Sequence, residues 1–187
     1  MLPLQATRRR FTVAEYHLMV DAGILTEDDR VELLAGEIIQ MTPIGHRHAS
    51  TVRRLNRLLA TAFGDAAEVD VQNPIALDES SEPQPDLALL RPSPDFYRSG
   101  HPRPADVLLL VEVAESSIQV DREVKVPLYA RASIAEIWLV DLNEDVVVDY
   151  REPSALGYRT VRTWRRGESL APLAFPKREI AIAEILG

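Results

Sequence analysis

Two short, almost uninterrupted apolar runs constrain this chain more than any other feature: "DLALL" at residues 86–90 and "VLLLVEV" at 107–113. Such runs are typical of central strands whose two faces are both covered. Each run carries one carboxylate, Asp86 at the start of the first and Glu112 near the end of the second. A buried carboxylate is costly unless it is paired. The sequence therefore predicts a covered sheet in which these two acids either face solvent at strand ends or have partners.

The other elements alternate between helical and extended patterns. Helices are expected at 12–23, 46–63 and 120–132, a hairpin at 30–41, strands at 67–77, 136–142, 145–151 and 158–164, and a last short strand running into a helical turn at 179–186. The proline-rich segment 91–106 reads as a surface loop. This order predicts an α/β fold, a mixed central sheet flanked by helices with an N-terminal helix and hairpin. The length predicts a single domain over residues 1–187.

Composition excludes several classes of protein. The chain has 187 residues, no cysteine and a net charge of −8. Without cysteine there are no disulfides, thiolate metal sites or cysteine nucleophiles. No apolar run approaches the roughly 20 residues of a membrane helix, and no secretory signal is evident, so we expect a cytoplasmic protein. The acidic charge argues against a protein that coats nucleic acid by bulk charge. Arginines in the segments 8–10, 53–57 and 162–166 could still bind phosphate locally. The simpler interpretation of each segment, taken alone, is an ordinary solvent-exposed surface.

Asp86 and Glu112 would meet if their two strands are neighbours. In an extended strand, Glu112 shares one face with Leu108 and Leu110, while Leu109, Val111 and Val113 share the other. Two carboxylates at adjacent strand ends can share one Mg²⁺, which prefers oxygen ligands. A structural ion pair or a solvated strand end is the alternative interpretation.

Lys125 is the third candidate for this site. It follows Asp121 by four residues, so an ordinary ion pair along a helix is one explanation. The other is an ammonium group that reaches the carboxylate pair. Pro127 is tolerated in the first turn of a helix but not deep inside one. The helix therefore either begins close to Lys125 or is kinked there.

In order and spacing, several segments resemble the Uma-two family of restriction endonucleases, part of the PD-(D/E)xK nuclease superfamily. The segments are "RVELLAGEIIQM", "HASTVRRLNRLL", "QPDLALL", "LLVEVAESSIQVDREVKVPLYARASIAEIWLVDL" and "GYRTV". The resemblance runs from about Phe11 to Leu186 and is most specific over residues 107–142. It implies a restriction-endonuclease-like mixed sheet, Mg²⁺-dependent hydrolysis of phosphodiester bonds in DNA, with Mn²⁺ as a substitute ion, and frequently a homodimer.

Position by position, the resemblance makes Asp86 the motif aspartate and Glu112 the second acid. The usual lysine of the superfamily would fall two positions after Glu112, where this chain has Ala114. Family members share this departure, so the resemblance implies that Lys125 on the following helix takes the place of that lysine.

Further residues are expected at the edge of the site. Glu32 matches a recurrent family acid, and the carbonyl of Val113 is expected to bind the metal with the two acids. Residues with a less certain contribution are His48, Gln72, Glu115 and Asp121. Each has a simpler explanation: Glu32 could face water on an edge strand, and His48 could cap or pack a helix. No zinc site is expected, because no metal-ligand spacing links the histidines His17, His46 and His101.

The expected function is therefore that of a metal-dependent endonuclease. Asp86 and Glu112 would hold one or two Mg²⁺, and Lys125 would orient the attacking water or stabilise the charged transition state. The alternative is a non-catalytic, oligomerising or regulatory module that keeps the fold, which the acidic charge and the displaced lysine favour. A nuclease of RNA or of another phosphodiester is a third possibility. A dimer would also cover the apolar segments 136–140 and 145–150, should they form sheet edges.

Overall fold

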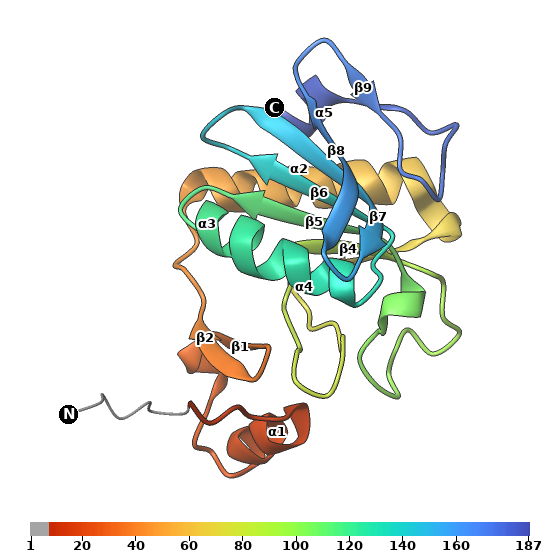
Figure 1. Cartoon of the computed structure of the whole chain (residues 1–187). Coiled ribbons are helices and arrows are strands. Elements are labelled where there is room, and N and C mark those ends of the chain that lie inside the picture. Colours follow the sequence, from red (N-terminus) through yellow and green to blue (C-terminus); the bar gives the residue numbers. More distant parts are fainter. Residues whose placement is uncertain (1–7) are drawn as a thin grey trace, which may run out of the picture.

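A six-stranded sheet lies at the centre of the computed structural model, which describes residues 8–187 (Figure 1). Its strand order is β3-β4-β5-β6-β7-β8. The strands are β3 (Glu68–Val71), β4 (Leu87–Leu90), β5 (Val107–Ala114), β6 (Glu136–Asp141), β7 (Val146–Ser154) and β8 (Gly157–Trp164). β5 and β6 run parallel and every other neighbouring pair is antiparallel. The predicted mixed sheet is confirmed, and "DLALL" and "VLLLVEV" are neighbouring strands within it.

Helices cover both faces of this sheet. The helix α2 (His46–Phe63) lies on one face, and a continuous helical segment made of α3 (Ile118–Val120), a π-helical turn η4 (Asp121–Lys125) and α4 (Val126–Arg131) lies on the other (Figure 1). The short α5 (Ile182–Leu186) joins α2 on the first face. All of these helices were expected from the sequence within a few residues.

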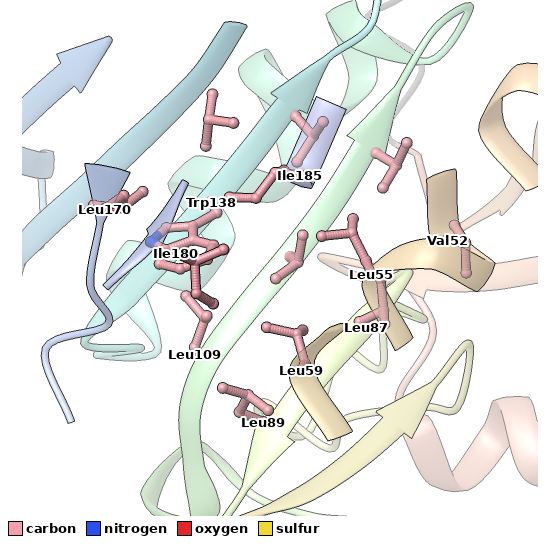
Figure 2. Close-up of a cluster of buried hydrophobic side chains, with 14 of the residues drawn as sticks. Val52, Leu55, Leu59, Leu87, Leu89, Leu109, Trp138, Leu170, Ile180 and Ile185 are labelled. Carbon is pink, nitrogen blue, oxygen red and sulfur yellow. The ribbon is translucent and has the colours of Figure 1, made fainter. Parts of the chain in front are cut away.

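The larger core lies between the sheet and α2. Leu55 and Leu59 of α2 point toward Leu87, Leu89 and Leu109 of the two central strands (Figure 2). Trp138 and the C-terminal Ile180 and Ile185 close the same core. Apolar residues at helical spacing on α2 meet apolar residues at alternate positions in the strands, which is why both periodicities were visible in the sequence.

The opposite face of the sheet carries Glu112. Leu110, Ile137 and Leu139 belong to the core cluster under α4, and Glu112 shares this face through the alternation of the strand. Leu108, expected on the same face, packs instead against the α2 core. The prediction is wrong at this residue because the register between β4 and β5 shifts at Leu89/Leu90. Such an irregularity reverses the alternation locally.

The N-terminal part forms a helix and a hairpin beside the sheet. Thr12 caps α1 (Val13–Asp21), accepting from the N–H of Glu15 at 3.2 Å. The hairpin consists of β1 (Val31–Leu34) and β2 (Glu37–Gln40). Gly36 in its turn has a φ of 79°, and a Cβ there would lie 2.7 Å from that of Arg10, so the turn requires glycine.

The segment 78–82 ties this N-terminal part to the rest of the molecule. Its carbonyl groups accept from the N–H of Val13 at 2.8 Å and of Gly36 at 2.7 Å, and the N–H of Glu82 donates to Leu33 at 2.8 Å. Figure 1 shows this loop descending from the sheet toward α1 and the hairpin. The hairpin is thereby held near the start of β4, where Asp86 lies.

Two local expectations need correction, and one element was not expected. The strand expected at 67–77 ends at Val71, because Gln72 has a φ of 55°, which breaks the extended chain. The segments 136–140 and 145–150 are interior strands, so they are not edges that need a partner. A two-residue strand β9 (Ser169–Leu170), which pairs with β10 (Ile180–Ala181), was not anticipated. Across residues 8–187, no helix combines the length and apolarity needed to span a membrane.

Candidate active site

Asp86 lies directly before β4 and is held by three donors. The N–H of Val113 donates to Oδ2 at 2.9 Å, and the side-chain amide of Gln72 donates to Oδ1 at 3.2 Å. The Nε2 atom of His48, in the first turn of α2, lies 3.0 Å from Oδ2. The left-handed backbone that ends β3 at Gln72 thus also turns this side chain toward Asp86. These contacts fix the orientation of the carboxylate.

Glu112 meets Asp86 from the neighbouring strand. Its side chain is 2% exposed, and its Oε2 lies 3.4 Å from the N–H nitrogen of Asp86. Its Oε1 accepts from the hydroxyl of Tyr129 at 2.6 Å and from the ammonium of Lys125 at 3.3 Å. The two acids singled out in the sequence are therefore adjacent in space, and the buried one has the partners that its burial requires.

Lys125 sits among carboxylates. Its Nζ lies 3.2 Å from Oε2 of Glu32, 3.3 Å from Oε1 of Glu112 and 4.0 Å from Oδ1 of Asp121. It also donates to the carbonyl of Gln84 at 3.4 Å. Both explanations offered for Lys125 are realised, because the contact with Asp121 along the helix exists together with a closer contact to the predicted site.

The π-helical turn explains how Lys125 reaches this position. Pro127 has no N–H to donate to the carbonyl of Glu123, so a regular α-helix cannot continue through it. The N–H of Val126 donates instead to Asp121, five residues back. A π-turn inserts one residue into the helix and rotates the side chains that precede it. The helix begins at Ile118 rather than near Lys125, and the irregularity expected from Pro127 is this turn.

Glu32 joins the site from the hairpin. It is 3% exposed, so it does not face water, and its Oε2 accepts from the N–H of Gln84 at 3.0 Å. Asp121 accepts from the hydroxyl of Ser117 at 2.5 Å. Glu115 lies farther out and contacts Arg47 at 3.4 Å.

A small pocket of about 80 Å³ connects these side chains with solvent. All the predicted side chains line it, namely Glu32, His48, Gln72, Asp86, Glu112, Glu115, Asp121 and Lys125. Since one water molecule needs roughly 10–15 Å³ of such volume, the pocket has room for several waters or a hydrated ion. A larger substrate would have to lie across its mouth.

Excess negative charge dominates the electrostatics of the site. Burial raises the pKa of Glu112 to about 8; Lys125 opposes this rise, and Asp121 and Asp86 add to it. Burial also raises the pKa of Asp121. Burial opposes the charge of Lys125, yet Glu112 and Glu32 raise its pKa above the ordinary value. These shifts have two causes, namely the burial of the groups and the presence of several carboxylates around a single ammonium group.

His48 experiences the same field. Burial lowers its pKa, but the hydrogen bond and charge of Asp86 outweigh burial and raise it. Its second ring nitrogen, Nδ1, is buried and has no hydrogen-bond partner among residues 8–187. His48 is thus a contact of Asp86 rather than a simple helix cap.

The donor set suits a hard divalent cation. Asp86 and Glu112 offer carboxylate oxygens, and Lys125 and Tyr129 contact Oε1 of Glu112 while Oε2 faces Asp86. A cation placed there would relieve the excess negative charge, and oxygen ligands are those that Mg²⁺ prefers. Val113 contacts Asp86 through its N–H, and a metal contact of its carbonyl stays a prediction.

The arginine-rich segments differ in whether their side chains already contact other residues. Arg9 pairs with Glu15 at 2.5 Å and Arg166 with Asp145 at 2.6 Å, while Arg162 stacks 3.6 Å from the ring centroid of Trp164. The exposed positions 53 and 57, one turn apart on α2, remain the better candidates for a phosphate contact.

Tyr129 is the main residue that sequence reasoning missed. It lies four positions after Lys125, so the helical spacing already placed both side chains on one side of the helix. Its role was not evident because its position falls among apolar residues and resembles an ordinary core aromatic.

Comparisons with known proteins show the family and the fold of the chain. Residues 13–183 match the model of the Uma2 family, described as "putative restriction endonuclease". No curated protein matches the chain. Among solved structures, the chain is similar to a "putative nuclease belonging to DUF820" from Anabaena variabilis, with 15% identity and a TM-score of 0.71 over 94% of this chain and 97% of that one. At this identity, the similarity shows the fold.

Proposed function

The chain belongs to the Uma2 family, and from that premise we propose that it is a Mg²⁺-dependent endonuclease that hydrolyses phosphodiester bonds in DNA. The observation that carries the proposal is the meeting of Asp86 and Glu112 at the ends of adjacent strands, with Lys125 on the second oxygen of Glu112. This is the constellation expected from the resemblance to PD-(D/E)xK nucleases. The family description supports a nuclease and the fold is that of a solved nuclease-like protein.

The proposed metal ligands are Asp86, Glu112 and the carbonyl of Val113. When bound, Mg²⁺ or Mn²⁺ would lower the pKa of a water molecule and neutralise charge on the phosphate. The protein's part is to hold the acids in place before substrate arrives. Val113, Gln72 and His48 fix Asp86, and fixed polar groups need no reorganisation during the reaction.

Lys125 has two tasks in this proposal. Its contact with Oε1 of Glu112 opposes the rise in the pKa of that carboxyl group and leaves Oε2 turned toward Asp86. Its ammonium also lines the pocket, where it opposes the negative charge that builds on the phosphate as the water oxygen attacks phosphorus. In the overall reaction, one P–O bond breaks, and the proton lost by the attacking water is balanced by one gained at the leaving oxygen.

One observation favours the non-catalytic alternative. The side chain of Lys125 is 6% exposed and lies between Glu32 and Glu112, an arrangement that a purely structural ion cluster would also adopt. In that case the chain would be a binding module with the nuclease fold. Metal binding separates the two functions, because a structural cluster neutralised by Lys125 has no need of a divalent ion.

The homodimer is also a proposal, and it rests on the resemblance to the family. The interior position of β6 and β7 removes one argument for it. Sedimentation equilibrium at micromolar concentration tests it directly, because a chain of 20.9 kDa and its dimer are easily distinguished.

Cleavage by the Asp86→Ala variant tests the catalytic proposal. Purified wild-type protein is incubated with supercoiled plasmid, linear duplex, single-stranded DNA and RNA in Mg²⁺, Mn²⁺ or EDTA. We expect metal-dependent cutting of DNA that falls by about a hundredfold or more in Asp86→Ala and Glu112→Gln. The matched control is Asp65→Ala, an exposed acid in the turn after α2, which should cut like the wild type.

Calorimetric titration with Mn²⁺ completes the test. The nuclease should bind Mn²⁺ through Asp86 and Glu112, and both variants should bind it much more weakly while they keep the wild-type circular dichroism spectrum. Equal cleavage by Asp86→Ala and the wild type would remove the assignment. A wild type that binds no divalent ion would favour the binding module, and a preference for RNA in the panel would change the substrate.

A further inference from the structure

A second group of metal-binding side chains lies outside the candidate active site. His17 of α1, Glu82 of the segment that ties α1 to the sheet, and His101 of the loop between β4 and β5 each offer one ligand atom, and these atoms lie within 4.8 Å of one another. None of the three lines the pocket around Asp86. They were not grouped from the sequence, because the residues are far apart along the chain and only the fold brings them together.

The three side chains differ in burial in a way that suits an ion entering from solvent. Glu82 is 4% exposed, whereas both histidines are exposed. The Nε2 atom of His17 lies 2.7 Å from Oε1 of Glu82, and the rings of His17 and His101 are 6.4 Å apart between centroids. The carboxylate thus forms the floor of the group, and the two imidazoles stand at its rim.

Backbone hydrogen bonds hold each of the three segments in place. The N–H of Glu82 donates to Leu33 at 2.8 Å, and the N–H of Val13 at the start of α1 donates to Glu79 at 2.8 Å. Next to His101, the carbonyl of Pro102 accepts from Ala76 at 2.9 Å. Figure 1 shows α1 and both loops on the same side of the sheet. The backbone that carries the three ligands is therefore held by the fold before any ion binds.

We propose that His17, Glu82 and His101 form a zinc site, with water as the fourth ligand. Two imidazoles and one carboxylate are a donor set that Zn²⁺ accepts in tetrahedral sites with one open position. With metal bonds of roughly 2.0–2.1 Å, tetrahedral ligand atoms are about 3.3 Å apart. The pair of His17 and Glu82 must open slightly from 2.7 Å, and His101 must move inward. Both histidine side chains are exposed, so rotations about their own bonds can supply these changes.

The site would link α1 to the candidate active site. Glu82 is two residues from Gln84, whose N–H donates to Glu32 and whose carbonyl accepts from Lys125. A zinc ion at Glu82 would fix this strand-like segment against α1 and against the loop that carries His101. Its role would be structural, because it would restrain the segment that supplies two backbone contacts to the site.

The simpler explanation is a hydrogen-bonded pair of His17 and Glu82, with His101 nearby by chance. His101 separates the two explanations, because it contacts the ring of His17 and has no hydrogen bond to Glu82 in the structure. The substitution His101→Ala therefore leaves the pair intact and removes one proposed ligand. His46→Ala is the matched control, since His46 is exposed at the start of α2 and away from the group.

The experiment is a titration of the full chain with Zn²⁺, followed by calorimetry and thermal unfolding. All proteins carry Asp86→Asn, which weakens zinc binding at the carboxylate pair. We expect one zinc per chain in this background, affinity at least about a hundredfold lower after His101→Ala or His17→Gln, and no change after His46→Ala. Zinc at a hundredfold over its Kd should raise Tm by about 5–10 °C, and only in proteins with both histidines.

Two results would overturn the zinc site. One is unchanged zinc affinity after His101→Ala, which would place the ion elsewhere. The other is the absence of zinc binding in the Asp86→Asn background. Cobalt(II) provides an independent check, because the visible absorption of a tetrahedral complex should appear in the parent protein and vanish in His101→Ala. Neither result depends on nuclease activity, so failure of the zinc site and failure of the nuclease proposal are distinguishable.

Discussion

Glu112 is nearly inaccessible to solvent, and each of its oxygens has a separate set of contacts. Tyr129 and Lys125 contact Oε1, whereas Oε2 faces the N–H of Asp86. The apolar strand around Glu112 predicted the need for a partner, and Lys125 was identified as one. The contribution of Tyr129 depends on how the helix is rotated against the sheet, which is a tertiary property that strand and helix periodicity do not contain.

Replacing Tyr129 by phenylalanine should impair the site more than the fold. The change removes the hydroxyl that donates to Glu112 at 2.6 Å and leaves the buried ring in place. We expect a loss of about 1–2 kcal/mol in the free energy of unfolding, typical of a buried side-chain hydrogen bond whose partner is left unsatisfied. Because Glu112 loses its orientation, kcat should fall by about tenfold or more. Urea titration and plasmid cleavage rates measure the two effects.

Tyr158→Phe is the control for this variant. Its hydroxyl donates to the carbonyl of Ile134 at 2.7 Å, on the same side of the sheet but outside the pocket. It should lose stability to a similar extent and keep the wild-type kcat. If both variants cleave equally well, Tyr129 has only a structural role.

The raised pKa of Glu112 predicts how metal binding depends on pH. A proton and a metal ion compete for the same carboxylate, and burial raises the pKa of Glu112 to about 8. Below that pH the carboxylate is increasingly protonated, so Mn²⁺ affinity should fall by up to about tenfold per pH unit. Titrations at pH 6, 7, 8 and 9 measure this slope. In Glu112→Gln the binding should be weak and the slope flatter; an identical slope in both proteins would assign the proton to another group.

The helix from Ile118 to Arg131 illustrates what local sequence signals can predict. Its extent was expected within a few residues, and Pro127 left two alternatives, a helix start close to Lys125 or a kink there, since proline cannot donate the backbone hydrogen bond of a regular helix. The structure has the second. The form of the irregularity, a π-turn that brings Lys125 to Glu112 and Glu32, was not predictable. It is selected by contacts with residues of β5 and the hairpin, and these are distant in sequence.

A second buried carboxylate connects β6, β7 and the C-terminal segment. Glu136 begins β6, and its Oε1 accepts from the guanidinium of Arg151 at 2.7 Å and from the indole of Trp138 at 2.9 Å. Its Oε2 accepts from the N–H of Leu173 at 2.6 Å. Burial raises the pKa of Glu136 to about 7, and the Leu173 bond opposes that rise. Arg151 also bonds Asp149 at 2.8 Å, so it compensates two buried acids.

Arg151→Met should therefore be strongly destabilising. It keeps the length of the aliphatic stem but leaves Glu136 and Asp149 without their cation, a change that costs about 3–5 kcal/mol in buried pairs. The pKa of Glu136 is higher in the folded state than its value of about 4.5 in the unfolded chain, so its protonation favours folding below pH 4.5. This contribution is lost as the pH rises through the pKa of the folded state. The variant's deficit in unfolding free energy should consequently be smaller at pH 5 than at pH 8.

Arg166→Met provides the matched comparison on an exposed pair. Arg166 contacts Asp145 at 2.6 Å, but both side chains are largely solvated. Its loss should change the free energy of unfolding by less than about 1 kcal/mol. Denaturant titrations of both variants at pH 5 and pH 8 measure these differences. Equal losses of unfolding free energy in the two variants would show that Glu136 does not depend on Arg151.

The whole molecule combines a predictable frame with contacts that only the fold reveals. The adjacency of Asp86 and Glu112 was conditional on their strands being neighbours, whereas the order of elements and the mixed sheet followed from apolar runs, which reflect burial locally. The contacts of Gln84 with Glu32 and Lys125 did not, because the backbone groups of a loop leave no pattern in the sequence. The group of His17, Glu82 and His101 was not predicted from the sequence for a related reason, since its members come from three separate segments.

Glu32 is where the N-terminal hairpin enters the candidate site, so it tests whether the hairpin belongs to that site. Its Oε2 binds Lys125 at 3.2 Å and accepts from Gln84 at 3.0 Å. Glu32→Gln keeps the size of the side chain but removes one of the charges that hold Lys125, and the pKa of Lys125 should fall. We expect cleavage to decrease by about tenfold or more and the free energy of unfolding by about 1–3 kcal/mol.

Glu37→Gln on the same hairpin is the control, because Glu37 is about one-third exposed and contacts Arg8 and Arg10 at 3.6 and 3.9 Å. Its stability should stay within about 0.5 kcal/mol of the wild type, with unchanged cleavage. Measured together, the two variants separate a general weakening of the hairpin from the loss of one charge beside Lys125. If Glu32→Gln cleaves at the wild-type rate, the hairpin merely covers the sheet edge, and the catalytic contribution reduces to Asp86, Glu112 and Lys125.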